Sequence, residues 1–144
     1  MNFLKLAAVS TSCVALLHLG CIVFGAPWYR FLGAGEQMAL MAEAGSHQPT
    51  IVTSVLVFIF VIWTAYALSG AGVIRKLPLL HPVLIAITTI LLLRGVGFYF
   101  IMPMFPDNSL MFWFISSSIC LLLGLLYALG LKQSWQGMPN KKLL

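Results

Sequence analysis

Long apolar stretches alternate with short polar segments along this chain. The apolar stretches show no sustained alternation of polar and apolar positions, so they predict helices rather than the strands of a barrel. A helix needs about 20 mainly apolar residues to cross a bilayer. Four segments are long enough, at 4–25, 50–72, 82–102 and 109–131. The pattern therefore predicts an all-α membrane protein whose single domain, residues 1–131, is a four-helix transmembrane bundle.

Composition supports lipid as part of the solvent. Of the 144 residues, 61% are hydrophobic and 8% are charged, which lies outside the range of soluble globular domains. The lipid bilayer is thus the first expected partner. The formal net charge of +5 does not indicate nucleic acid, because the basic residues lie at the span ends and form no dense basic stripe.

The basic residues also predict an orientation. Lysine and arginine concentrate before the first span, between the second and third, and after the fourth, whereas the other side carries Arg30 alone. Because cytoplasmic loops are enriched in Lys and Arg, both termini are expected in the cytoplasm. We expect a multi-pass protein of the cell inner (plasma) membrane, with loop 26–49 outside and residues 132–144 as a flexible cytoplasmic tail.

The long outer loop contains a second helix signal. Residues 35–44 are rich in helix formers, and Gly45 follows them as a candidate C-cap. Glu36 and Glu43 are seven residues apart, so they share one face of a helix. We therefore expect a short amphipathic helix that acts as a lid in the first extracytoplasmic loop.

Arg94 lies inside the third span, and it is the most informative single residue. A charge at bilayer depth costs at least a few kcal/mol, so such residues usually face a bundle interior, a cavity or a partner charge. The chain has only three acidic residues, Glu36, Glu43 and Asp107, and these are the candidate partners. Two interpretations of Arg94 stay open: it forms structural hydrogen bonds between helices, or it takes part in anion binding or a proton relay.

Other polar residues place a candidate pocket near Arg94. His18 lies in the middle of the first span, at a depth similar to that of Arg94 when counted at about 1.5 Å per residue. Polar residues are more frequent in the outer halves of the spans than in the inner halves, which predicts a pocket that opens to the outside. The predicted ligand-binding residues are Arg94, His18, Glu36, Glu43, Tyr99 and Ser117.

The sequence gives little support for a metal site, a cofactor or a catalytic group. Inside the spans, no His pairs with another His or a carboxylate at helical spacing, and no phosphate-binding glycine loop is present. The three cysteines fall within spans without a C-x-x-C motif, which indicates packing. We therefore name no metal ligand, no cofactor and no catalytic residue.

Three functions remain open on these residues. The leading hypothesis is a small integral membrane protein that binds a polar or anionic small molecule or a lipid headgroup, as a transporter component or accessory protein. The second is a membrane enzyme acting on a lipid or quinone, with His18 as general base and Arg94 stabilising negative charge; the lack of a nucleophile motif weighs against it. The third is a structural subunit. A small-residue ridge in the last span could serve a homo-oligomer or a partner membrane subunit; it comprises Ser116, Cys120, Gly124 and Ala128.

Overall fold

The computed structural model describes residues 2–33 and 35–136, and within these residues it contains helices and no strands. Four helices are long, and short helices occupy two of the connections between them. The helices are α1 (Phe3–Phe24), α2 (Ala26–Phe31), α3 (Glu36–Glu43), α4 (Gln48–Gly70), α5 (Leu80–Val96), α6 (Phe98–Ile101), the 3-10 turn η1 (Met102–Met104) and α7 (Leu110–Gln136).

Local signals in the sequence explain where these helices begin and end. The side chain of Asn2 accepts hydrogen bonds from the backbone N–H groups of Leu4 and Lys5, which caps the start of α1. Gly25 has a φ of 70°, a conformation that glycine adopts without steric cost, and it separates α1 from α2. Proline occupies the first turn of α2 and of α4, where its missing N–H costs nothing.

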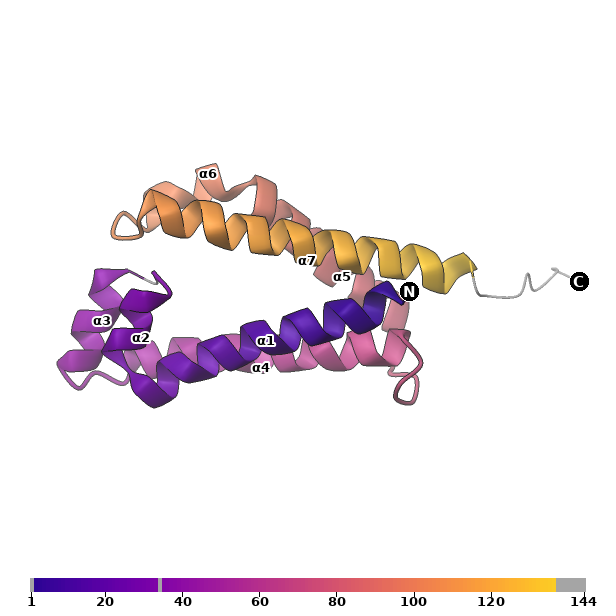
Figure 1. Cartoon of the computed structure of the whole chain (residues 1–144), viewed down its shortest axis with the longest axis horizontal. Coiled ribbons are helices and arrows are strands. Elements are labelled where there is room, and N and C mark those ends of the chain that lie inside the picture. The colour runs from indigo at the N-terminus through magenta and orange to yellow at the C-terminus, as the bar shows by residue number, and fades with distance from the viewer. Residues whose placement is uncertain (1, 34, 137–144) are drawn as a thin grey trace, which may run out of the picture.

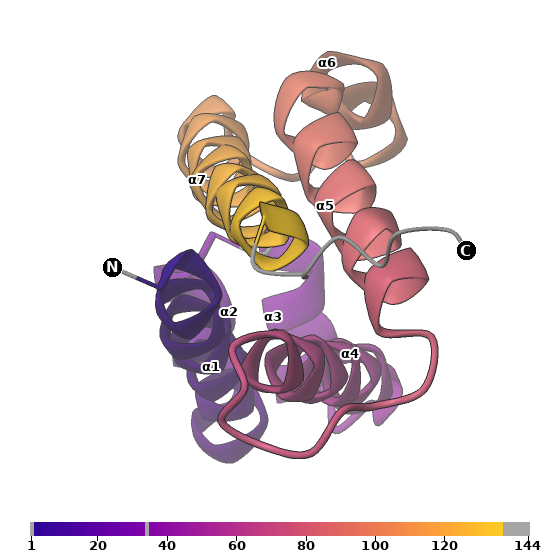
Figure 2. The same cartoon turned by 90° about the vertical axis from the view of Figure 1, so that its right-hand side faces the viewer.

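The long helices form two antiparallel hairpins. In the first hairpin α1 packs along α4, and in the second α5 packs along α7 (Figure 1). Helix α7 also packs against α1, which joins the hairpins. The view along the long axis shows the four helices at four corners, with α7 beside both α1 and α5 (Figure 2).

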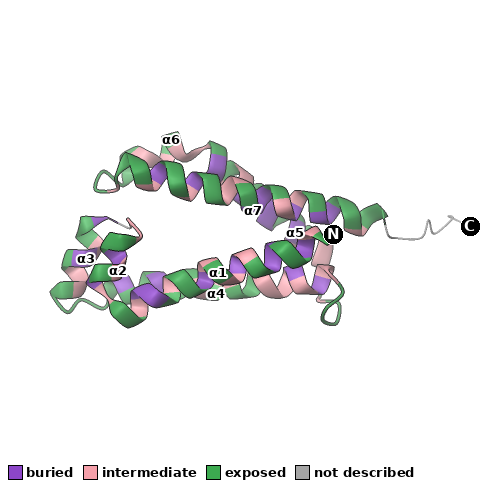
Figure 3. Ribbon diagram, viewed as in Figure 1, coloured by how far each residue is buried: buried purple, intermediate pink, exposed green. Residues whose placement is uncertain are grey.

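The two ends of the molecule differ. At one end, which we call the closed end, lie the start of α1, the connection 71–79 and the last turns of α7; at the other, the open end, lie α2, α3 and the connection 102–109 (Figure 1). The main core draws buried side chains from all four long helices towards the closed end, as the burial colours show (Figure 3). Its members are Leu4, Ala7, Ala8, Ala67, Leu84, Ile87, Leu91, Leu123, Tyr127 and Leu131.

Close packing around Leu4 holds the closed end together. A Cβ atom added at Gly130 of α7 would lie 2.5 Å from Leu4 Cγ and 2.9 Å from the Leu4 backbone nitrogen. A Cβ at Gly70 of α4 would lie 2.7 Å from Leu4 Cδ1. The missing side chains of these two glycines therefore allow α1 to approach both α4 and α7 closely, as small residues do between membrane helices.

A buried hydrogen-bond network adds polar contacts to this packing. The hydroxyl of Tyr127 donates to the carbonyl of Trp63 at 3.1 Å, and its oxygen lies 3.2 Å from Thr11 Oγ1. Because the Tyr127 proton goes to the carbonyl, the Thr11 hydroxyl acts as donor in the second bond. One tyrosine of α7 thus connects α1 and α4.

Three helices, α1, α4 and α7, are long and apolar enough to cross a membrane, and α5 with the segment 98–104 would form a fourth span that is bent by 73°. Large apolar side chains on these helices are exposed in the isolated chain, among them Phe58 of α4 at 66%. Such surfaces suit contact with lipid, and the prediction of a multi-pass, all-helical membrane protein agrees with them.

The bend corrects the expectation of one continuous helix over residues 82–102. Helix α5 ends at Val96, and the chain turns at Gly97. A Cβ atom at Gly97 would lie 2.7 Å from the carbonyl oxygen of Leu93, so the turn requires a residue without a side chain. The last helix is also longer than predicted, because α7 continues past Leu131 to Gln136. The rest of the predicted tail, residues 137–144, lies outside the described part of the chain.

Candidate functional site

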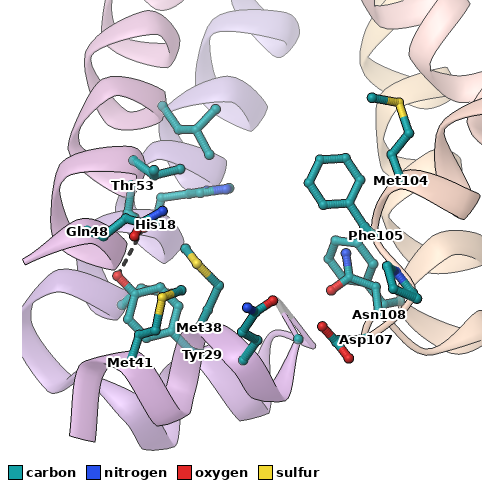
Figure 4. Close-up of a pocket in the computed structure, with 17 residues that line it drawn as sticks. His18, Tyr29, Met38, Met41, Gln48, Thr53, Met104, Phe105, Asp107 and Asn108 are labelled. Atoms are coloured by element: carbon teal, nitrogen blue, oxygen red, sulfur yellow. Dashed lines mark hydrogen bonds between the residues drawn. The ribbon is translucent and has the colours of Figure 1, made fainter. Parts of the chain in front are cut away.

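A pocket of about 520 Å³ lies at the open end, between the two hairpins (Figure 4). Its volume is typical of small-molecule sites. The first hairpin and its connection contribute His18, Cys21, Tyr29, Gly35, Gln37, Met38, Met41, Gln48, Val52, Thr53 and Leu56 to the wall. The second hairpin contributes Met104, Phe105, Pro106, Asp107, Asn108 and Phe112, and its labelled residues face those of the first across the pocket (Figure 4).

Helices α2 and α3 form one side of this pocket because they fold back onto α1 and α4. Cys21, Ala26, Tyr29 and Ala39 make a small buried cluster that joins α1, α2 and α3. Tyr29 is 2% exposed, and its hydroxyl lies 3.0 Å from Oγ1 of Thr53 on α4. This hydrogen bond and the apolar cluster fix the position of the connection between α1 and α4.

His18 brings a titratable group to the pocket wall. Its Nδ1 lies 2.8 Å from the carbonyl oxygen of Val14, one turn earlier in α1. Because a carbonyl only accepts hydrogen bonds, Nδ1 must carry the proton, and Nε2 of the neutral ring is then an acceptor. The ring also packs against Phe60, with the ring centres 5.2 Å apart. In the neutral tautomer that this contact selects, Nε2 can accept a hydrogen bond from a ligand that carries a donor.

The remaining walls combine adaptable apolar side chains with a few polar groups. Met38, Met41 and Met104 are flexible and polarizable, and methionines of this kind adjust to different ligand shapes. Gln37, Gln48 and Asn108 supply amides, and Asp107 is the one carboxylate among the described residues that line the pocket. The walls thus offer apolar contact surface together with a few hydrogen-bonding groups.

Glu36 and Glu43 lie on the surface of α3 and bind Arg30 of α2. Arg30 Nη2 is 2.6 Å from Glu36 Oε1, and Arg30 Nη1 is 2.5 Å from Glu43 Oε1. The Arg30 guanidinium lowers the pKa of both carboxyl groups, and their hydrogen bonds raise the pKa of Arg30. Neither glutamate reaches Arg94. The nearer cation in the same connection satisfies both of them, and it does so at an exposed position where pairing needs little desolvation.

Arg94 binds groups of its own hairpin instead. Its Nη1 donates to Ser117 Oγ at 3.1 Å and its Nη2 to Ser116 Oγ at 3.3 Å. The guanidinium carbon lies 4.9 Å from the centre of the Trp113 ring, which is a cation–π contact. Arg94 is half-buried between α5 and α7 and does not line the pocket.

The structure therefore separates the six predicted ligand-binding residues. His18 lines the pocket, Arg94 and Ser117 contact each other beside it, and Glu36 and Glu43 bind Arg30. Tyr99 is 69% exposed and packs edge-on against Phe100. It follows the bend at Gly97, so the helical periodicity that would align it with Arg94 is lost.

Sequence reasoning missed Tyr29, Gln37, Gln48 and Asn108 of the pocket. Three of these residues belong to the connections and Gln48 begins α4, and their convergence depends on how α2 and α3 fold back, which no periodicity predicts. The pairing with Arg30 had a usable signal, because this arginine is the one cation expected on that side and both glutamates follow it in the same connection.

Among the described residues, no group of three or more His, Cys, Asp or Glu side chains is placed to hold a metal ion. Comparison of the chain with known protein families, with curated proteins and with solved structures gives no match. The site must therefore be interpreted from its own residues.

Proposed function

We propose that this protein is a small integral membrane protein of the inner membrane that binds a small amphipathic molecule in an outward-facing pocket. The observation that carries the proposal is the pocket of about 520 Å³ to which both hairpins contribute walls. A ligand held there would contact α1, α3 and α4 on one side and the connection 102–109 on the other. Such a protein would serve as a transporter component or as an accessory that holds the molecule at the membrane surface.

The chemistry of the walls supports an amphipathic ligand. Methionine and aromatic side chains would bind its apolar part, and His18 with the amides of Gln37, Gln48 and Asn108 would bind its polar group. Specific small-molecule sites commonly combine mainly apolar walls with a few placed polar groups. A shared role of His18 and Arg94 in catalysis has less support, because the pocket contains the first residue and not the second.

The charges at the two ends support the outward direction of the pocket. Lys5 lies at the closed end, and so does the connection that carries Arg75 and Lys76. At the open end Arg30 is balanced by two glutamates, and Asp107 adds a further negative charge. By the preference of Lys and Arg for the cytoplasm, the closed end would face inward and the open end outward.

The test is to identify what the protein carries when it is extracted gently from membranes. Leu56 lines the pocket and is 37% exposed, so Leu56→Trp would fill the pocket without a clash in the core. Leu122 of α7 is 64% exposed and does not line it, so Leu122→Trp is the matched control.

Mass spectrometry of the three purified proteins should find a small amphipathic molecule with the wild type and with Leu122→Trp, and a large loss with Leu56→Trp. Equal amounts in all three proteins would contradict binding in this pocket. The absence of any such molecule from the wild type would contradict it as well.

A further inference from the structure

The surroundings of Arg94 contain more hydrogen-bond donors than acceptors. A guanidinium has five N–H groups, and two of those of Arg94 are used, by the hydroxyl oxygens of Ser116 and Ser117. The other three find no acceptor among the residues that the structure describes. Among the residues that the structure describes, Arg94 also has no carboxylate within ion-pair distance, and both ion pairs found there involve Arg30.

Trp113 adds a fourth free donor beside them. The residue is 2% exposed, and its ring lies under the Arg94 guanidinium. Its Nε1–H is buried and has no hydrogen-bond partner. A buried donor without an acceptor is destabilising, so such groups are rare in native proteins and call for a physical explanation.

The depth of Arg94 along α5 makes it costly for this cation to lack a partner carboxylate. It is the fifteenth residue of α5, about 20 Å along the helix axis from Leu80 at 1.5 Å per residue. A cation at this depth is normally compensated by a partner charge. Two serine hydroxyls and one aromatic face supply partial charges only.

We propose that Arg94 and Trp113 form a binding site for an oxyanion, a carboxylate or phosphate carried by an apolar chain. The anion would accept hydrogen bonds from the free N–H groups of Arg94 and from Nε1–H of Trp113, while Ser116 and Ser117 hold the guanidinium in place. Neither Arg94 nor Trp113 lines the pocket at the open end. Two residues of the pocket wall, Phe105 and Phe112, are neighbours of Trp113, with ring centres 6.3 and 5.5 Å from that of the indole. It does not depend on the proposed function.

Two sources could supply this chemistry: an anionic lipid of the bilayer or a free fatty acid. The protein is reconstituted into nanodiscs of equal parts phosphatidylglycerol and phosphatidylcholine, and native mass spectrometry measures which lipid stays bound. In a second arm, phosphatidylcholine nanodiscs receive dodecanoate, with dodecanol as the neutral control of the same chain length. Enrichment in the first arm identifies the lipid as the source, and enrichment in the second identifies the fatty acid.

Variants distinguish an anion site from a structural tie. Arg94→Gln should lower the enrichment about ten-fold or more, and Trp113→Phe, which keeps a ring but removes the N–H, about five-fold. Ser116→Ala with Ser117→Ala removes the two hydroxyl oxygens that hold the guanidinium but keeps every N–H donor, so the enrichment should fall much less than in Arg94→Gln. Arg75→Gln, at the closed end, should change nothing.

The proposal is overturned if neither phosphatidylglycerol nor dodecanoate is enriched over its neutral counterpart. It is also overturned if the double serine variant loses the anion as completely as Arg94→Gln does, since binding would then depend on the contact between α5 and α7 and not on the guanidinium itself. Either result would leave the pocket at the open end untouched, because that pocket is tested with Leu56→Trp.

Discussion

The hydroxyl of Tyr29 on α2 lies 3.0 Å from Oγ1 of Thr53 on α4, and both residues line the pocket at the open end. This contact joins a short helix of the connection to a long helix of the first hairpin. It is buried, with 2% of Tyr29 and 3% of Thr53 exposed. The shape of the pocket on this side therefore depends on one side-chain hydrogen bond and on the apolar cluster around it.

Tyr29→Phe should loosen the connection without unfolding the bundle. The substitution keeps the ring in its cluster and leaves the Thr53 hydroxyl without this partner, at a cost of about 1 kcal/mol. Amide hydrogen exchange in α2 and α3 should become about five-fold faster, since about 1 kcal/mol changes an opening equilibrium by that factor. Exchange in α7 should not change.

A double-mutant cycle with Thr53→Val tests the hydroxyl pair itself. The double variant should lose less free energy of unfolding than the sum of the losses in the two single variants, and strict additivity would show that the two hydroxyls are not coupled.

Tyr127→Phe should weaken the closed end. It removes the donor to the Trp63 carbonyl and the acceptor for Thr11, and both partners lie in the interior of the bundle. The expected loss is about 1–3 kcal/mol in the free energy of unfolding, measured by denaturant titration in detergent. Tyr99→Phe is the control, because Tyr99 is 69% exposed, and its stability should equal that of the wild type. Equal stabilities for both variants would mean that the network around Tyr127 does not hold the hairpins together.

Acid should loosen the contact between α2 and α3. Arg30 lowers the pKa of Glu36 and Glu43, so their ion pairs are fully present above the ordinary glutamate pKa of about 4.3 and are lost as the pH falls through the lowered values. Hydrogen exchange in α3, corrected for its intrinsic pH dependence, should therefore rise below about pH 4.

The size of this acid effect should be small, because all three side chains are exposed and exposed ion pairs contribute little. Arg30→Gln should show the faster exchange already at neutral pH and a flat dependence below it. A wild-type acid response that survives in Arg30→Gln would come from another group.

The hydrophobic pattern was sufficient to predict the helical class and the long apolar helices, because about 20 apolar residues in a row leave few alternatives. It did not predict the bend at Gly97, since one glycine in an apolar segment is compatible with a straight helix as well. The turn depends on how closely the Leu93 carbonyl approaches that position. Such a distance follows from the three-dimensional packing and cannot be derived from the order of residues.

The candidate site was predicted less completely. Arg94 and His18 were identified because polar groups in apolar segments are conspicuous, yet the sequence could not show that they face different surroundings. Whether two residues on different helices meet depends on helix rotation and crossing. Among the described residues, Arg94 lies between α5 and α7 with Ser116, Ser117 and Trp113, whereas His18 faces the pocket.

The outward opening of the pocket at the α2–α3 end can be measured by labelling with a membrane-impermeant maleimide. In a variant whose three cysteines are replaced by alanine, single cysteines are placed at Asn108, which lines the pocket, and at Val73, which is 53% exposed in the connection at the closed end. Intact cells should label Asn108→Cys, and Val73→Cys should react only after the membrane is opened. Labelling of Val73→Cys in intact cells, with Asn108→Cys protected, would show that the pocket faces the cytoplasm.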